Sequence, residues 1–142
     1  MTGCIVGWAH TPFGKFDAES VESLIVRVAT DAIADAGITP SDVDEIVLGH
    51  FNAGFSQQDF TASLVLQASP DLRFKRATRV ENACATGSAA VHQGLKAIAA
   101  RTARIVLVVG AEQFDHERQR ISQLQFFEVV VNRRGRIERQ LK

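Results

Sequence analysis

The residue with the clearest chemical potential is Cys84, which stands between a short apolar segment and an alanine-rich one. The sequence around it reads Glu81-Asn82-Ala83-Cys84-Ala85-Thr86-Gly87-Ser88. Asn82 is a good helix N-cap, so we expect a helix to begin there with Cys84 in its first turn. Unpaired N–H groups and the positive end of the helix favour a thiolate at that place. A reactive thiol for thioester chemistry is one interpretation, and a small buried cysteine is the other.

Three more groups follow apolar runs that are typical of strands. His10 follows residues 4–9, His50 follows residues 45–49 and Glu112 follows residues 104–110. The ends of parallel strands share one edge of a sheet, so these groups are expected near Cys84. A Cys–His pair at that edge could hydrolyse a thioester. We favour the alternative that His10 and His50 are loop residues bonded to the backbone or facing a subunit interface, because catalysis needs the two side chains about 3 Å apart.

Other polar groups are interpreted as structural. Cys4 lies inside an apolar run and is expected in the core, while Glu112 is expected to cap a loop. His92 lies eight residues beyond the candidate thiol, about 12 Å along a helix. The basic residues at positions 75, 76 and 79 could meet a coenzyme A phosphate, but an ordinary solvated surface is favoured.

The elements that must position these groups alternate along the chain. We expect strands at residues 4–9, 45–49, 77–81 and 104–110, and helices at about 20–36, 58–68 and 82–100. Asp17 or Ser20 can cap the first helix and Gly37 can end it. The alternation predicts an α/β fold with a mainly parallel sheet and helices on both faces. The first strand is expected to be buried on both faces because its residues form an unbroken apolar run.

The composition indicates a globular domain with no strong charge. The 142 residues are 46% hydrophobic, and sixteen basic groups balance sixteen acidic ones. We therefore predict no nucleic-acid partner and no membrane partner. Two cysteines make no disulfide framework, and neither a signal peptide nor a membrane-spanning run is evident. A cytoplasmic protein is expected.

The segment around Cys84 resembles the nucleophile motif of the thiolase superfamily, in particular its sterol-carrier-type branch. Residues 5–16, 42–49 and 105–113 are similar to the first, second and fourth strands of that family, in the same order. The resemblance covers residues 1–113 and implies the thiolase-like N-terminal α/β domain, which is the first half of a two-half fold.

The resemblance implies an acyltransferase of the acetyl-CoA acetyltransferase type, acting in fatty acid metabolism. Cys84 would be the catalytic nucleophile that attacks an acyl-CoA or 3-ketoacyl-CoA, and its own N–H would stabilise the oxyanion. Coenzyme A thioesters would be substrates, with no separate cofactor and no metal; the residues that bind coenzyme A are not identified. Thiolases pair through this first half, so a homodimer is expected.

Several parts of the family pattern are absent. The second half of a thiolase supplies an activating His, a second Cys and an Asn, and none of those motifs occurs here. The large loop region and the fifth strand of the first half are also expected to be missing. The 142 residues are therefore expected to be unable to complete turnover alone. A non-catalytic dimerisation module and a Cys–His thioesterase remain as alternatives.

The composition changes at Gln113/Phe114. Residues 1–113 carry nine basic and twelve acidic groups, whereas residues 114–142 carry seven basic and four acidic groups and no alanine. One hypothesis is that residues 114–142 are a frameshifted or rearranged tail on a truncated thiolase. The alternative is a divergent tail whose apolar run at residues 126–131 completes the edge of the sheet.

Overall fold

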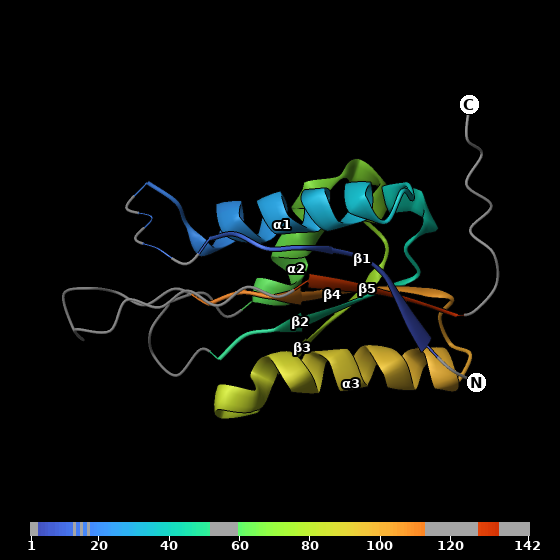
Figure 1. The fold of residues 1–142 in the computed structure, drawn as a ribbon. Helices are drawn as coiled ribbons and strands as arrows, with labels where there is room; N and C mark the ends of the chain where they lie inside the picture. Colours follow the sequence, from blue (N-terminus) through green and yellow to red (C-terminus); the bar gives the residue numbers. More distant parts are fainter. Residues whose placement is uncertain are drawn as a thin grey trace.

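The computed structural model describes residues 3–12, 14, 16, 18–51, 60–112 and, for the backbone alone, 128–133. The helices and strands are β1 (Gly3–Ala9), α1 (Val21–Asp35), β2 (Glu45–Gly49), α2 (Thr61–Leu64), β3 (Arg76–Val80), α3 (Thr86–Ala99), β4 (Ile105–Gly110) and β5 (Glu128–Arg133). Short 3₁₀ helices lie at Pro40–Asp42, Val65–Ala68, Pro70–Leu72 and Ala83–Ala85. Figure 1 shows three layers, with α1 and α2 on one face of the sheet and α3 on the other.

The five strands form one mixed sheet in the order β1-β5-β4-β2-β3. β2 pairs in parallel with both β3 and β4, while β5 pairs antiparallel with β4 and β1. Because β1 and β4 both oppose β5, these two strands run in the same direction, as do β2 and β3. The predicted α/β fold with a mainly parallel sheet and helices on both faces is confirmed.

β5 corrects the expectation that the fifth strand is missing. Val131 pairs with Ile5 of β1 on one side and with Val106 of β4 on the other. The strand therefore lies inside the sheet, and the alternative of a tail strand at the sheet edge was wrong in its position. The reason is that the valine-rich run of β5 has high β propensity and fits between two strands that run the same way.

The apolar stripe of α1 is buried as its spacing predicts. Its core-facing residues pack over the α1 side of β2 and β4, and the fully buried ones include Leu24, Ile25, Val28, Ala29 and Ala32. Ser20 caps the helix and accepts a hydrogen bond from the Ser23 N–H, while Gly37 has a φ of +64° just beyond the end. The predicted cap at Ser20 and stop at Gly37 are confirmed; Asp17 lies outside the described residues.

α3 covers the opposite face of the sheet. Its buried residues pack against β2 and β4 in one cluster of Ala90, Ala97, Ile98, Val47, Val106 and Val108. The predicted helix at 82–100 is shorter as an α-helix, because residues 83–85 form a 3₁₀ turn before Thr86. The helix expected at 58–68 is likewise a single α turn, α2, followed by a 3₁₀ helix.

β1 is not buried on both faces. Ile5 and Trp8 are 62% and 58% exposed, and Cys4 is only half-buried. The prediction of a fully buried strand and a core cysteine was wrong because β1 is an edge strand, and an apolar run does not distinguish the two. The other face of β1 packs closely under α1: a Cβ on Gly7 would lie 2.5 Å from the Ala36 backbone nitrogen.

Candidate active site

The ends of the parallel strands gather at one edge of the sheet, beside the start of α3 (Figure 1). Backbone hydrogen bonds join these ends: the His50 N–H donates to the Val80 carbonyl at 3.2 Å, and the Ala111 N–H donates to the Gly49 carbonyl at 3.1 Å. The segments that carry His50, Cys84 and Glu112 therefore meet at the same edge, as the sequence predicts.

Cys84 is exposed and lies in the 3₁₀ turn Ala83–Ala85 that connects β3 to α3. The sequence predicts Cys84 in the first turn of the α-helix, whereas the structure places it in the 3₁₀ turn just before that helix. Asn82 is the N-cap residue of the 3₁₀ turn, but its side chain makes no capping hydrogen bond. Because the thiol is exposed, the alternative of a small buried cysteine does not describe it. Its catalytic role stays a prediction.

The backbone just before the thiol is strained. Ala83 has a φ of +44°, in the left-handed region that residues with a Cβ seldom adopt. Such a conformation costs about 1–3 kcal/mol and persists only where surrounding contacts hold it. The turn is also packed closely on β2, since a Cβ on Gly49 would lie 3.1 Å from both the methyl carbon and the carbonyl oxygen of Thr86. Strain and close packing together present Cys84 at the end of the sheet.

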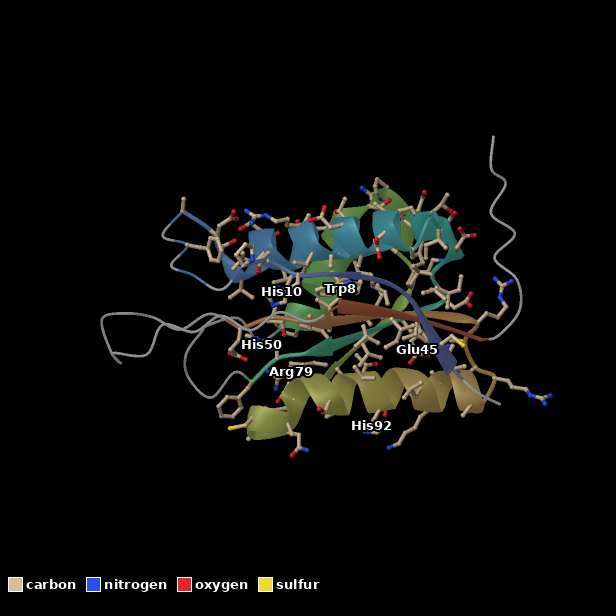
Figure 2. The ribbon with its side chains drawn as sticks, in the orientation of Figure 1. Trp8, His10, Glu45, His50, Arg79 and His92 are labelled. Carbon is tan, nitrogen blue, oxygen red and sulfur yellow. The ribbon has the colours of Figure 1, made fainter. Side chains whose placement is uncertain are left out.

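His50 is fully buried at the end of β2 and is labelled in Figure 2. Its Nδ1 lies 2.6 Å from the Ala111 carbonyl oxygen, which can only accept, so Nδ1 carries the proton and donates. Burial lowers the pKa of His50, so the neutral form is favoured. Its Nε2 has no hydrogen-bond partner among the described residues. The interpretation of His50 as a residue bonded to the backbone is confirmed.

Glu112 lies beside His50 at the end of β4. Its Oε2 accepts a hydrogen bond from the Phe51 N–H at 2.8 Å and lies 3.8 Å from His50 Nδ1. Burial raises the pKa of Glu112 to about 7. The loop-capping role is present, but the sequence did not predict that this acid is partly buried, because a glutamate that follows a strand gives the same pattern whether it is exposed or not.

His92 and the basic patch at positions 75, 76 and 79 do not join this group. His92 is exposed along α3, and the groups of the basic patch have partners within the chain. Arg76 pairs with Glu45 at 3.0 Å, and Lys75 donates to the Ser41 carbonyl at 2.9 Å. These contacts favour the interpretation of the patch as ordinary surface over a coenzyme A phosphate site.

No metal site is evident within the described ranges, where no three His, Cys, Asp or Glu side chains come together suitably. Over the same ranges, none of the helices has the length and apolar character needed to cross a membrane.

Comparison with solved structures identifies the fold. The fold resembles the Acat5 thiolase from Ascaris suum in complex with coenzyme A, with a TM-score of 0.68 and 24% identity over 78% of this chain and 30% of that one. It also resembles human mitochondrial 3-ketoacyl-CoA thiolase in complex with CoA (TM-score 0.70, 22% identity, 78% of this chain and 29% of that one). A priming β-ketosynthase from the R1128 polyketide pathway gives a TM-score of 0.72 at 14% identity, over 92% and 49%. At these identities the likeness shows the fold alone, which is that of thiolases and ketosynthases.

Sequence comparison gives the family. The model of the thiolase N-terminal domain matches residues 3–134, and this chain therefore belongs to the thiolase family. The acetyl-CoA acetyltransferase of Methanocaldococcus jannaschii is 39% identical over 110 residues, which are 77% of this chain and 28% of that protein. The acetyl-CoA acetyltransferase of Methanothermobacter thermautotrophicus is 34% identical over the same shares. The predicted acyltransferase family is confirmed.

The family match extends further along this chain than the resemblance in the sequence, but it covers only part of the relatives. The family match continues through residue 134 and so includes β5, beyond Gln113, where the resemblance read from the sequence ended. The chain spans about 28% of the length of the curated relatives. Whether residues 114–142 are a divergent or rearranged tail stays a prediction.

Proposed function

We propose that Cys84 is the nucleophile of a thiolase-type acyl transfer and forms an acyl-enzyme with an acyl-CoA substrate. The observation that carries this proposal is the exposed Cys84 thiol in a strained turn at the strand ends of a thiolase-family sheet. The sulfur attacks the thioester carbonyl, the carbon–sulfur bond to coenzyme A breaks, and coenzyme A leaves as its thiol with the proton from Cys84. Unpaired N–H groups at the start of the helix stabilise the oxyanion.

By themselves, these 142 residues carry the proposed reaction only as far as the acyl-enzyme. No hydrogen bond to the Cys84 sulfur occurs in the part of the chain that the structure describes, and His50 is directed to the Ala111 carbonyl. The groups that move protons in the second half-reaction belong, by the family resemblance, to a second half. Coenzyme A thioesters act as substrates, and no separate cofactor takes part.

Mass spectrometry of the intact chain after incubation with acetyl-CoA tests this proposal. We expect one acetyl group on the wild type, located on the peptide that contains Cys84 and absent from Cys84→Ser. Cys4→Ser is the matched control and should be acetylated like the wild type, because Cys4 lies on β1 away from the turn. A wild type without an adduct, or equal labelling of the two variants, would contradict the proposal.

We also propose that two copies of the chain associate through β3, which remains compatible with a non-catalytic assembly role. β3 is an edge strand and pairs with β2 alone among the described strands. The opposite edge is less open: the Trp8 N–H donates to the Asp35 carboxylate at 2.9 Å, and the β1 register is interrupted between Ile5 and Gly7. Bulges and side chains at an edge oppose strand addition, so β3 is the favoured edge.

The oligomeric state of an Ala77→Pro variant tests this assembly. The Val80 carbonyl accepts from the His50 N–H and so points toward β2. In a parallel strand, donors alternate between sides, so Ala77 points its N–H to the open edge. Sedimentation should show a dimer for the wild type and a monomer for Ala77→Pro, with Thr78→Val as the dimeric control. A monomeric wild type would exclude the association, whereas a dimer without acetylation would favour a non-catalytic module.

A further inference from the structure

Thr86 opens α3 two residues after Cys84, and its side chain is buried. Its hydroxyl makes two hydrogen bonds to the backbone of the preceding turn. It accepts from the Asn82 N–H at 2.8 Å and donates to the Ala83 carbonyl at 2.7 Å. These two backbone groups lie on either side of the left-handed residue Ala83, so one hydroxyl bridges the strained part of the turn.

The methyl group of Thr86 fixes the direction of this hydroxyl. It points at Gly49, where an added Cβ would lie 3.1 Å from the Thr86 methyl carbon. A β-branched side chain has few rotamers, and contact of its methyl group with β2 selects one of them. The absence of a side chain at Gly49 therefore lets Thr86 sit between the sheet and the turn with its hydroxyl aimed at the turn.

No other side chain supports this turn within the ranges that the structure describes. The Asn82 side chain makes no capping hydrogen bond, and the remaining bond of the turn is the backbone one from the Ala85 N–H to the Asn82 carbonyl at 2.9 Å. That bond closes the turn but does not favour a positive φ at Ala83. Among the described side chains, the Thr86 hydroxyl is therefore the one hydrogen-bonded to the backbone on both sides of Ala83.

We propose that Thr86 is a positioning residue for Cys84. Its hydroxyl holds Ala83 in the left-handed conformation and thereby fixes the direction of the Cys84 thiol and of the neighbouring N–H groups. The consequence for acyl transfer rests on the proposed function, whereas the hydrogen-bonded turn is independent of it.

Thr86→Val and Thr86→Ser, made in the full chain, separate the hydroxyl from the methyl group. Valine keeps the shape and removes both hydrogen bonds, while serine keeps both bonds. Cys84 should be acetylated by acetyl-CoA at least about tenfold more slowly in Thr86→Val, and within about threefold of the wild type in Thr86→Ser. Equal rates in the two variants would overturn the proposal.

Hydrogen exchange gives a readout that requires no acyl transfer. The Asn82 amide should exchange about tenfold faster in Thr86→Val than in Thr86→Ser, while amides of α1 and β4 exchange alike in both. The same Asn82 exchange rate in both variants would overturn the proposal. If the wild type is not acetylated, the proposed function fails, and the exchange result alone decides about Thr86.

A glycine at position 83 tests the link to backbone strain. Glycine adopts a positive φ without strain, so it does not depend on the Thr86 hydroxyl. In an Ala83→Gly background, Thr86→Val should slow the acetylation of Cys84 by less than about threefold, although Asn82 still exchanges faster because its acceptor is lost. Slowing as large as in the alanine background would show that Thr86 does not act through Ala83 and would overturn that part of the mechanism.

Discussion

The thiol and the acid at the strand ends have opposite environments. Cys84 is exposed, whereas His50 is fully buried and Glu112 is partly buried, and this burial favours the neutral form of both. The lowered pKa of His50 favours the neutral imidazole, and the raised pKa of Glu112 keeps its carboxyl largely protonated below about pH 7.

Replacing Glu112 by glutamine should change how stability depends on pH. The pKa of Glu112 is about 7 in the folded chain against 4.5 for an unperturbed glutamate. Its contribution is fully present below pH 4.5 and is lost as the pH rises to about 7, because the unfolded chain ionises first. The loss amounts to about 3 kcal/mol at most. Urea unfolding should therefore show Glu112→Gln more stable than the wild type at pH 8 and similar to it at pH 4.5.

Asp31→Asn provides the matched control, because Asp31 is an exposed carboxylate on α1. The difference between this variant and the wild type should be small at both pH values. His50 titrates in the wild type and in both variants, so its own effect largely cancels in the comparison. If Glu112→Gln gains no stability at pH 8, ionisation of the Glu112 carboxyl does not destabilise the folded chain, which would contradict this prediction.

At the scale of the elements, α1 and β1 are in close contact at Gly7, which has no side chain. Gly7 lies directly under Ala36, and the added Cβ that would clash meets backbone atoms of the helix end, which cannot rotate away. The same helix end supplies Asp35, which accepts the Trp8 N–H. The edge strand β1 is therefore fixed by the end of α1 as well as by its pairing with β5.

Gly7→Ala should destabilise the chain by about 1–3 kcal/mol, since overpacking forces α1 away from β1. The midpoint of urea unfolding measures this change. Gly14→Ala is the control, because its Cβ would meet only the Phe16 ring at 3.9 Å, which is ordinary contact. Similar midpoints for Gly7→Ala and the wild type would show that β1 and α1 are packed less closely.

At the scale of the whole molecule, β5 connects two parts of the sheet. Among the described strands, β1 pairs with β5 alone, so within this part of the sheet it is joined to the other parallel strands through residues 128–133. The segment that differs most in composition from the rest of the chain thus occupies an interior strand. Its position also explains why the thiolase family match extends beyond residue 113.

Removing β5 should therefore release β1. A chain that ends after residue 113 should lose protection from hydrogen exchange in β1 and unfold at lower urea than a chain that ends after residue 134. The second chain keeps β5 and should behave like the full chain. If the shorter chain is as stable as the longer one, the β1–β5–β4 pairing contributes little to the fold.

Local sequence patterns predicted the helices and strands well, but they did not predict which strands lie side by side in the sheet. The stripe of α1, the cap at Ser20 and the turn at Cys84 could be predicted, because each depends on residues close in sequence. The exposure of Trp8 and the interior place of β5 could not, because strand order is set by pairing between distant segments. In the site, the shared edge followed from topology, whereas the His50–Ala111 contact depends on side-chain packing that no motif encodes.

The place of β5 also sets an order of events in folding. Gly3 pairs with Arg133, so β1 has its sheet partner only after residues 128–133 have been synthesised. Until then the apolar stripe of α1 and the open side of β4 lack part of their cover, and such surfaces favour association between nascent chains. Pairings this distant are also slow to form. Folding on the ribosome should therefore begin with β2, β3, β4 and their helices, and incorporate the N-terminal strand last.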